Sequence, residues 1–245
     1  MASNDALKRL ASYSRTPGRW IISALESVQE SHGTGRQDPG WFHPSSLGND
    51  CDARLAFAFL GAPAIQDIAA RTQRIFDNGS GRDAYLKADM ARSGISLIRR
   101  EEDRKILISE LRIRGELDDL VQNPVTKQIA VVDYKTMRSE EWSALEAVKK
   151  DHHLQLHPYM FDKQTMYGFV LYENKDNQEF KVHQANFNQS IWQTEIVDRI
   201  TRIITGLEHG YVNRTPTNCR SCPYFANGVC TNNDIEGLKA LSGLY

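Results

Sequence analysis

Two apolar-rich segments joined by a turn constrain the fold of this chain more than any other feature. The segments cover residues 113–121 and 129–134, and the connection between them contains the pair Asn123-Pro124, which favours a turn. The pattern therefore predicts two adjacent antiparallel strands. Val131 and Val132 are consecutive apolar residues, so the second strand is expected to be buried on both of its faces.

Charged side chains accompany both predicted strands. Asp118 belongs to the first, whereas Asp133 and Lys135 belong to the second and point the same way because they are two residues apart. Buried carboxylates need partners, and one divalent cation can satisfy two of them. Asp118, Asp133 and the backbone carbonyl of Tyr134 therefore form a candidate Mg2+ or Mn2+ site, where Lys135 can orient a water for phosphodiester hydrolysis. The alternative is an ion pair between Asp118 and Lys135, with Asp119 as a solvated neighbour.

Two further patterns flank this strand pair. Downstream, Gln155 and Tyr159 are four residues apart and share one face if their segment is helical. Upstream, Gly79 and Asp83 have the same spacing in a segment that is expected to form a helix. The polar groups of four separate segments are thus candidates for a single site.

These patterns and their order resemble the RecB-like branch of the PD-(D/E)XK nuclease superfamily. That branch has Gly-x-x-x-His, Gly-x-x-Asp, Asp/Glu-x-Lys and Gln-x-x-x-Tyr in sequence. The matching segments here are Gly79 to Asp83, Gly115 to Asp118, Asp133 to Lys135, and Gln155 to Tyr159. The resemblance implies an α/β fold in which helices flank a mixed central β-sheet.

The resemblance also implies a role for each residue of the site. Asp118 and Asp133 are expected to bind the catalytic metal, and Lys135 to assist the nucleophilic water. Gln155 and Tyr159 are expected to contact DNA or to support the site.

Asp83 departs from the family pattern, which usually has histidine at this position. An aspartate can still ligate Mg2+ or Mn2+, so Asp83 is expected to be a third metal ligand and to favour hard cations. The alternative is an ion pair between Asp83 and Arg82 or Arg92.

Four cysteines form a second pattern. Cys219 and Cys222 make a Cys-x-x-Cys pair, Cys230 follows, and Cys51 lies far upstream. Residues 1–8 lack the apolar core of a secretion signal, so disulfides are disfavoured, and the close C-terminal spacing disfavours unrelated thiols. A set of four thiolates can hold either a zinc ion or an iron-sulfur cluster.

One cysteine before the nuclease core and three after it is also the arrangement of a RecB-like subgroup that includes AddB-type subunits and CRISPR-associated exonucleases. This resemblance implies that Cys51, Cys219, Cys222 and Cys230 hold a [4Fe-4S] cluster, with Zn2+ as the alternative. Closing the long loop from Cys51 to Cys219 would stabilise the fold by roughly 5 kcal/mol in the chain-entropy model. The cluster is therefore expected to be mainly structural.

The length of 245 residues suits a single nuclease domain over residues 1–245. Within it we expect an N-terminal helical arm (residues 1–50), a nuclease core (51–210) and a C-terminal iron-sulfur segment (211–245) that closes with Cys51. Further expected elements are helices over residues 20–28 and 64–92 and from Cys51, a helix capped by Ser139, one around Gln155 and one capped by Asn188, and strands over residues 95–98, 105–108, 167–172 and 180–185.

The net charge of −1 gives no general sign of a nucleic-acid partner. Candidate phosphate contacts are Arg71, Arg74, Arg82, Arg99, Arg100, Arg112, Arg114, Lys149 and Lys150. Three histidines, His152, His153 and His157, are more readily explained as packed or surface residues than as metal ligands, and the sequence indicates no specific partner for His43. The longest apolar stretch, residues 55–60, is too short to span a membrane.

Together with its residues, the resemblance implies that this chain is a cytoplasmic, metal-dependent DNA exonuclease that uses Mg2+ or Mn2+ and carries a [4Fe-4S] cluster. Its partner would be single-stranded DNA or duplex ends, in recombination, repair or CRISPR adaptation, within a bacterial, archaeal or phage-infected cell. The alternatives are a non-catalytic nucleic-acid-binding or adaptor protein of the same fold and a zinc-stapled nuclease. Protein partners and a homo-oligomer are left open.

Overall fold

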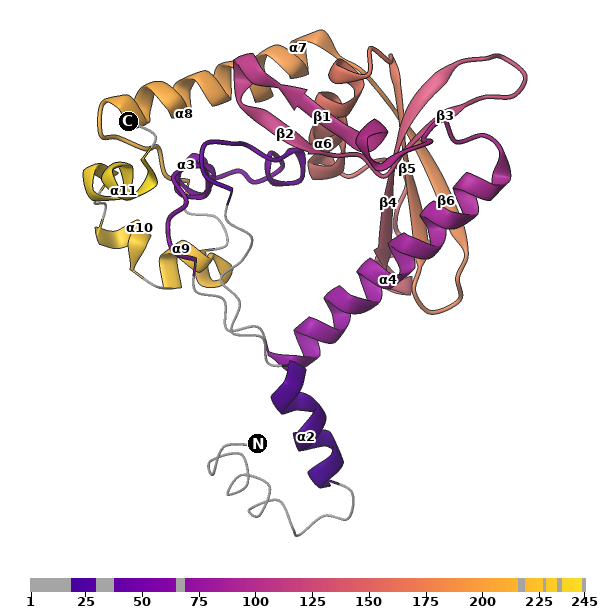
Figure 1. Cartoon of the computed structure of the whole chain (residues 1–245), viewed down its shortest axis with the longest axis horizontal. Coiled ribbons are helices and arrows are strands. Elements are labelled where there is room, and N and C mark those ends of the chain that lie inside the picture. Colours follow the sequence, from indigo (N-terminus) through magenta and orange to yellow (C-terminus); the bar gives the residue numbers. More distant parts are fainter. Residues whose placement is uncertain are drawn as a thin grey trace.

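A four-stranded sheet with helices on both sides forms the centre of the molecule (Figure 1). The computed structural model describes residues 19–29, 38–64, 69–215, 219–226, 228–232 and 235–243. Over these ranges, no helix combines the length and the apolar character that crossing a bilayer requires. The mixed α/β architecture that was expected is confirmed.

The central sheet contains both parallel and antiparallel pairs. Its order is β3 (Asp119–Gln122), β4 (Ile129–Met137), β5 (Tyr167–Asn174) and β6 (Phe180–Asn186). β4 pairs with β3 in antiparallel register and with β5 in parallel register, and β6 is antiparallel to β5. A parallel pair requires a crossover connection, which here contains helix α6 (Lys150–Asp162).

Helix α6 packs closely against one face of the sheet. A Cβ atom at Gly168 in β5 would lie 3.2 Å from side-chain atoms of Leu156 and Val131, so the helix approaches the strands where glycine leaves room. Val131 and Leu156 are both fully buried. The expected burial of β4 is confirmed on this face.

The opposite face of β4 is covered by helix α4 (Ala70–Ser93), which runs diagonally across the sheet (Figure 1). Leu86 of this helix forms a small buried cluster with Val132 and Tyr134. Consecutive residues of β4 therefore point into two apolar layers, as their lack of alternation predicted.

The expected strand over residues 113–121 is wrong in its extent, because the chain leaves one sheet and enters another at Leu117. β2 (Ile113–Glu116) pairs with β1 (Lys105–Ile108) in a separate two-stranded sheet, and only β3 pairs with β4. The backbone N–H of Leu117 donates instead to the Arg104 carbonyl at 3.0 Å. The tertiary position of buried Leu117 overrides the apolar-rich pattern of residues 113–121.

Two other local expectations also differ from the structure. Residues 95–98 form a single bridge, Ser96 to Val121, rather than a strand. Ser139 does not cap a helix: α5 (Ser139–Ser143) has Arg138 before it without a side-chain cap, and the Ser139 hydroxyl donates to Asn174 and Asp176. The cap predicted at Asn188 is confirmed, since its side chain accepts from two backbone N–H groups.

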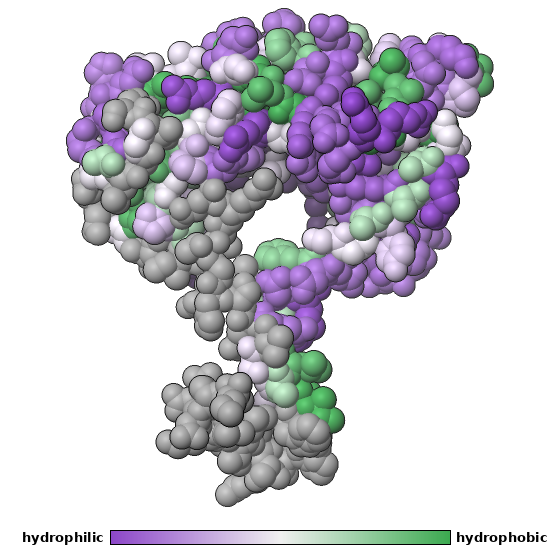
Figure 2. Space-filling view, viewed as in Figure 1, coloured by the Kyte–Doolittle hydropathy of each residue, from purple (hydrophilic) through white to green (hydrophobic). Residues whose placement is uncertain are grey.

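The remaining elements surround these layers. They are α2 (Arg19–Gln29), η1 (Pro44–Ser46), α3 (Asp52–Phe59), η2 (Glu101–Arg104), η3 (Ser109–Leu111), α7 (Gln189–Ile191), η4 (Trp192–Val197), α8 (Asp198–Glu208), η5 (Cys219–Ser221), α9 (Pro223–Ala226), α10 (Val229–Asn232) and α11 (Ile235–Ser242). Hydrophilic side chains dominate much of the face in Figure 2, and a hydrophobic group marks α2, where Ile21, Ile22 and Leu25 are exposed.

A buried ion-pair network fastens α8 to the start of α3. The Arg199 guanidinium donates to Asp52 Oδ1 at 2.7 Å and to the backbone carbonyls of Leu47 and Asn49. Arg202 binds the other oxygen of Asp52 at 3.1 Å. Arg199 and Asp52 are 7% and 5% exposed, so this charge pair lies inside the fold and has the partners that burial requires.

Candidate active site

The β3–β4 pair holds two carboxylates close together. Asp133 lies within β4 and is only 1% exposed. Asp118 immediately precedes β3, and its Oδ2 accepts a hydrogen bond of 2.7 Å from the backbone N–H of Tyr134. Within β4, the Tyr134 N–H thus holds the Asp118 carboxylate, and the residue before it, Asp133, supplies the second carboxylate.

Both oxygens of Asp133 have a polar neighbour. Lys135 Nζ lies 2.6 Å from Oδ2 as an ion pair, and the Gln155 side-chain amide donates to Oδ1 at 2.8 Å. Tyr159 donates its hydroxyl proton to the Glu116 backbone carbonyl at 3.1 Å. The Gln155 amide also lies 3.4 Å from the Tyr159 hydroxyl, so α6 carries a connected polar pair beneath Asp133.

Helix α4 brings Asp83 to the same place, accompanied by Lys87. Lys87 Nζ lies 2.7 Å from Asp83 Oδ2 and 3.1 Å from Asp118 Oδ1. The alternative pairing of Asp83 with Arg82 or Arg92 is wrong, since those arginines bind Glu173 and Asp89.

Sequence reasoning did not single out Lys87. The available signal was its spacing, because residues four apart in a helix are neighbours and Asp83 is one turn away. Its second contact, with Asp118, could not be inferred from that spacing.

The alternative account of the strand pair is also wrong. Asp118 pairs with Lys87 rather than with Lys135. Asp119 is fully buried and accepts hydrogen bonds from the Ser96 hydroxyl at 2.6 Å and the Tyr134 hydroxyl at 3.2 Å. Asp119 therefore anchors the layer behind the site.

Burial and neighbouring negative charge raise the pKa of two carboxylates of the site, Asp133 and Asp83. Burial raises the pKa of Asp133 to about 7, with Lys135 opposing the rise and Asp118 adding to it. Burial likewise raises the pKa of Asp83, where the Asp118 charge adds to the rise and Lys87 opposes it. Burial alone would lower the pKa of Lys87, but the charges of Asp118 and Asp83 raise it overall. The cluster therefore has a deficit of positive charge.

The residues present suit a hard divalent cation. Three carboxylates converge, and Asp83 Oδ1 is buried without a hydrogen-bond partner. Oxygen donors of this kind are what Mg2+ and Mn2+ prefer. Across the described ranges, however, no three His, Cys, Asp or Glu side chains are grouped as in an assembled metal site. Instead, lysine ammoniums lie against the carboxylates, and the expected Tyr134 carbonyl ligand stays a prediction.

The cysteines do not form an assembled metal site either. All four are free thiols of intermediate burial, and no three of them are gathered closely enough to hold an ion. Cys51 is the residue before α3, and Cys222 and Cys230 pack against the main core. The Phe57 and Tyr224 rings lie 5.6 Å apart, which places α3 beside α9 (Figure 1). The segments meet, although their thiols are not clustered.

The histidines have structural partners. His152 Nδ1 lies 2.8 Å from the Tyr172 hydroxyl, and His157 is fully buried with its Nε2 accepting from the Asn188 backbone N–H. His43, for which no partner was expected, pairs with Asp38 at 3.2 Å.

Most of the candidate phosphate contacts are engaged within the protein. Arg82, Arg100, Arg114, Lys149 and Lys150 form ion pairs with Glu173, Asp103, Asp38, Glu141 and Asp50, and Arg74 pairs with Glu26. These arginine and lysine side chains could contact DNA phosphates only if they left their carboxylate partners or bound both groups at once.

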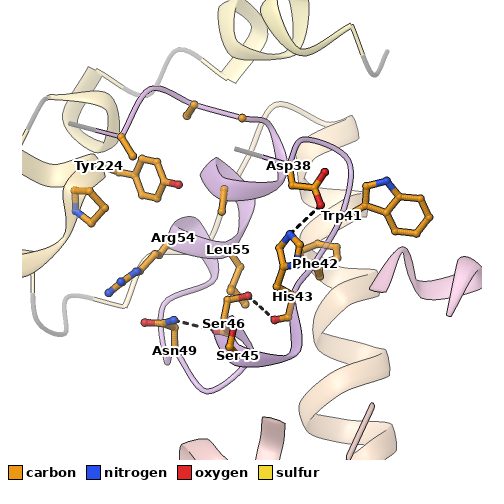
Figure 3. Close-up of a pocket in the computed structure, with 15 residues that line it drawn as sticks. Asp38, Trp41, Phe42, His43, Ser45, Ser46, Asn49, Arg54, Leu55 and Tyr224 are labelled. Atoms are coloured by element: carbon orange, nitrogen blue, oxygen red, sulfur yellow. Dashed lines mark hydrogen bonds and ion pairs between the residues drawn. The ribbon is translucent and has the colours of Figure 1, made fainter. Parts of the chain in front are cut away.

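A cavity of about 650 Å³ opens beside Gln155 and Tyr159. A second pocket of about 300 Å³ shares three of its lining residues, Asp38, His43 and Ser45 (Figure 3). The two hollows therefore adjoin, and space for an extended ligand continues away from the carboxylates. Asn49 and Arg54 also line the second pocket (Figure 3).

Comparison with known proteins gives one family and several distant structures. Residues 7–230 match the family model described as the PD-(D/E)XK nuclease superfamily. The crystal structure of SSO0001 aligns with a TM-score of 0.49 and 17% identity, covering 84% of this chain and 95% of that one. No curated protein sequence matches significantly.

An alkaline exonuclease (LHK-Exo) from Laribacter hongkongensis aligns with a TM-score of 0.49 and 11% identity over 76% of this chain and 92% of its own. The same exonuclease in complex with dAMP aligns with a TM-score of 0.46 and 13% identity over 69% and 89% of the two chains.

Proposed function

Because this chain belongs to the PD-(D/E)XK nuclease superfamily, we propose that it is a DNA nuclease that hydrolyses phosphodiester bonds with Mg2+ or Mn2+. The observation that carries the proposal is the contact of Lys135 and Gln155 with the buried Asp133, next to Asp118. Asp83, Asp118 and Asp133 would hold the metal. When bound, the metal would supply positive charge for the transferring phosphate and lower the pKa of the attacking water.

The protein residues would divide the remaining work between them. Lys135 would use its ammonium to orient the attacking water and to oppose charge that builds up on the phosphate. Gln155 fixes the orientation of Asp133, and the Tyr134 N–H fixes that of Asp118. Tyr159 supports Gln155 from the same helix. Each of these groups is held before substrate arrives, as electrostatic catalysis requires.

Isosteric substitution tests the proposal. Asp133→Asn and Lys135→Met, assayed on end-labelled single- and double-stranded DNA with Mg2+ or Mn2+, should each lose about 10²-fold or more of cleavage. Lys175→Met, which removes an exposed positive charge elsewhere, is the matched control. Cleavage at the wild-type rate by either site variant, with its fold intact, would contradict the assignment.

We expect exonuclease action on DNA ends, within recombination, repair or CRISPR adaptation in a cytoplasm. The cavity beside Gln155 and Tyr159, together with the pocket that adjoins it, supports an extended single strand as the ligand. Comparing linear with circular DNA tests this point, since an exonuclease leaves intact circles undegraded.

A [4Fe-4S] cluster on Cys51, Cys219, Cys222 and Cys230 belongs to the same proposal. The donor chemistry supports it, whereas the spacing of the thiols does not fit an assembled site, so any cluster must draw them together. Anaerobic purification, metal analysis and absorption near roughly 400 nm distinguish iron-sulfur from zinc. Bound zinc or bound iron should be lost in Cys51→Ala.

One observation favours a non-catalytic nucleic-acid-binding protein as the second candidate. Lys87 lies between two of the three carboxylates, where it competes with any metal. This candidate expects DNA binding without cleavage at any Mg2+ or Mn2+ concentration, so the assay above decides between the two.

A further inference from the structure

Lys87 connects two carboxylates that belong to different elements. Its ammonium lies 2.7 Å from Asp83, one turn earlier on α4, and 3.1 Å from Asp118, which precedes β3. An ion pair confined to α4 would provide a partner for Asp83 alone. The second contact makes Lys87 a link between the helix and the edge of the sheet.

In the described residues, the Lys87 ammonium offsets negative charge on Asp83 and Asp118 that no other ion pair offsets. Lys135 is already engaged with Asp133. Arg104 influences Asp83 through its charge, but its recorded ion pair is with Glu101 at 3.8 Å. In the described part of the chain, Lys87 is therefore the cation that contacts Asp83 and Asp118 directly.

A cation at this position excludes a second one. A divalent ion bound to the same Asp83 and Asp118 oxygens would lie close to the Lys87 ammonium, and the two positive charges would repel each other. The Lys87 side chain is 27% exposed, so it is not sealed in the interior and its flexible stem can carry the charge outward.

We propose that Lys87 is the resident cation of the metal-free site and that a divalent ion binds by exchange with its ammonium. The inference deepens the proposed function and rests on it. Asp83 and Asp118 would hold the ion once the ammonium has left, and Asp83 offers a further oxygen, Oδ1, which is buried without a hydrogen-bond partner. Lys87 stays protonated and turns toward solvent. No covalent bond forms or breaks.

Exchange has two consequences that oppose each other. Removing the ammonium should strengthen metal binding, because the ion no longer displaces a competitor. The same substitution should lower the thermal stability of the metal-free protein, because two carboxylates lose their shared partner. A lysine that merely helped to bind DNA would produce neither effect.

Substitution of Lys87 in the full chain measures both effects. Lys87→Met keeps the aliphatic stem, and Lys87→Gln is a second variant in case the first does not fold. Titration of Mn2+ by calorimetry should show about tenfold tighter binding, equal to about 1.4 kcal/mol. The metal-free melting temperature should fall by a few degrees and recover with Mn2+. Arg92→Met, which removes an exposed charge from the same helix, should change neither quantity.

Chemical labelling of the wild type gives an independent readout. Acetylation of Lys87, followed by mass spectrometry, should be slow without metal and faster with Mn2+, whereas labelling of exposed Lys175 should not change. Unchanged labelling of Lys87, or Mn2+ binding in a folded variant that equals or falls below wild type, would overturn the exchange.

The outcomes also separate this inference from the proposed function. If Lys87→Met binds Mn2+ more tightly while Asp133→Asn still cleaves DNA fully, the proposed function is wrong and the exchange at Lys87 is supported. If Asp133→Asn loses cleavage while Lys87→Met binds Mn2+ as wild type does, the proposed function is supported and the exchange at Lys87 is wrong. Absence of Mn2+ binding to every form overturns both.

Discussion

The Gln155 side-chain amide donates a hydrogen bond of 2.8 Å to Asp133, reaching from helix α6 to strand β4. The contact ties the helix that covers the sheet to the carboxylate inside it. Because Gln155 is 7% exposed and also neighbours the Tyr159 hydroxyl, its amide is held in one orientation. Its effect on the proposed chemistry is therefore indirect, through the carboxylate that it positions.

Gln155→Leu should lower metal-dependent cleavage by about 10–100-fold while the protein stays folded, since loss of a hydrogen bond to a ligating carboxylate typically has that effect. Mn2+ affinity from calorimetry should fall alongside activity. Gln184→Leu, on the exposed edge strand β6, should leave both unchanged. A Gln155→Leu variant with normal Mn2+ affinity and normal cleavage would show that Asp133 needs no such support.

Stability should fall in mild acid because of His152. Burial lowers the pKa of this imidazole to about 4, with Asp151 opposing the effect and Lys135 and Lys149 adding to it. The unfolded chain takes up this proton near pH 6.5, but the folded protein does so only near pH 4. The native state therefore keeps its full advantage above pH 6.5 and loses it as the pH falls toward 4.

His152→Gln removes this titration. Between pH 7 and pH 5, wild type should lose about 1–2 kcal/mol more of its unfolding free energy than the variant does. Urea unfolding at the two pH values measures the difference. Parallel losses in the two proteins would mean that His152 takes up its proton equally in the folded and unfolded states.

Arg199→Met should be among the most destabilising single substitutions. It leaves the buried Asp52 carboxylate without its main partner, which typically costs about 3–5 kcal/mol. Arg202→Met is the internal control, because Arg202 is 56% exposed and an exposed partner contributes about 1 kcal/mol or less. Equal losses in urea unfolding would assign the stabilisation to the carboxylate's surroundings rather than to Arg199.

The sequence indicated the centre of the molecule well, because its signals were local. Unbroken apolar residues at Val131 and Val132 predicted a strand buried on both faces, and Asp133 followed two residues after the first of them. The polarity of Asn188 before an apolar stripe predicted a helix cap that the structure contains. Each of these follows from a few neighbouring residues.

What the sequence did not indicate depends on distant contacts. Leu117 ends a strand because its N–H binds the Arg104 carbonyl, and nothing in the apolar pattern marks that point. Lys87 reaches Asp118 only once α4 lies over the sheet. The spacing of the four cysteines suggested a common ligand, but spacing does not report distances between thiols, and in the described residues no three of them are grouped as a metal site requires.

The bond between Asp52 and Arg199 joins residues 147 positions apart in the chain. A ribosome that adds roughly 5–20 residues per second needs on the order of ten seconds to travel between them. Throughout that interval the newly made α3 segment carries an aspartate whose arginine has not yet been synthesised. The contact that fixes the start of α3 to α8 can therefore form only after α8 has been synthesised.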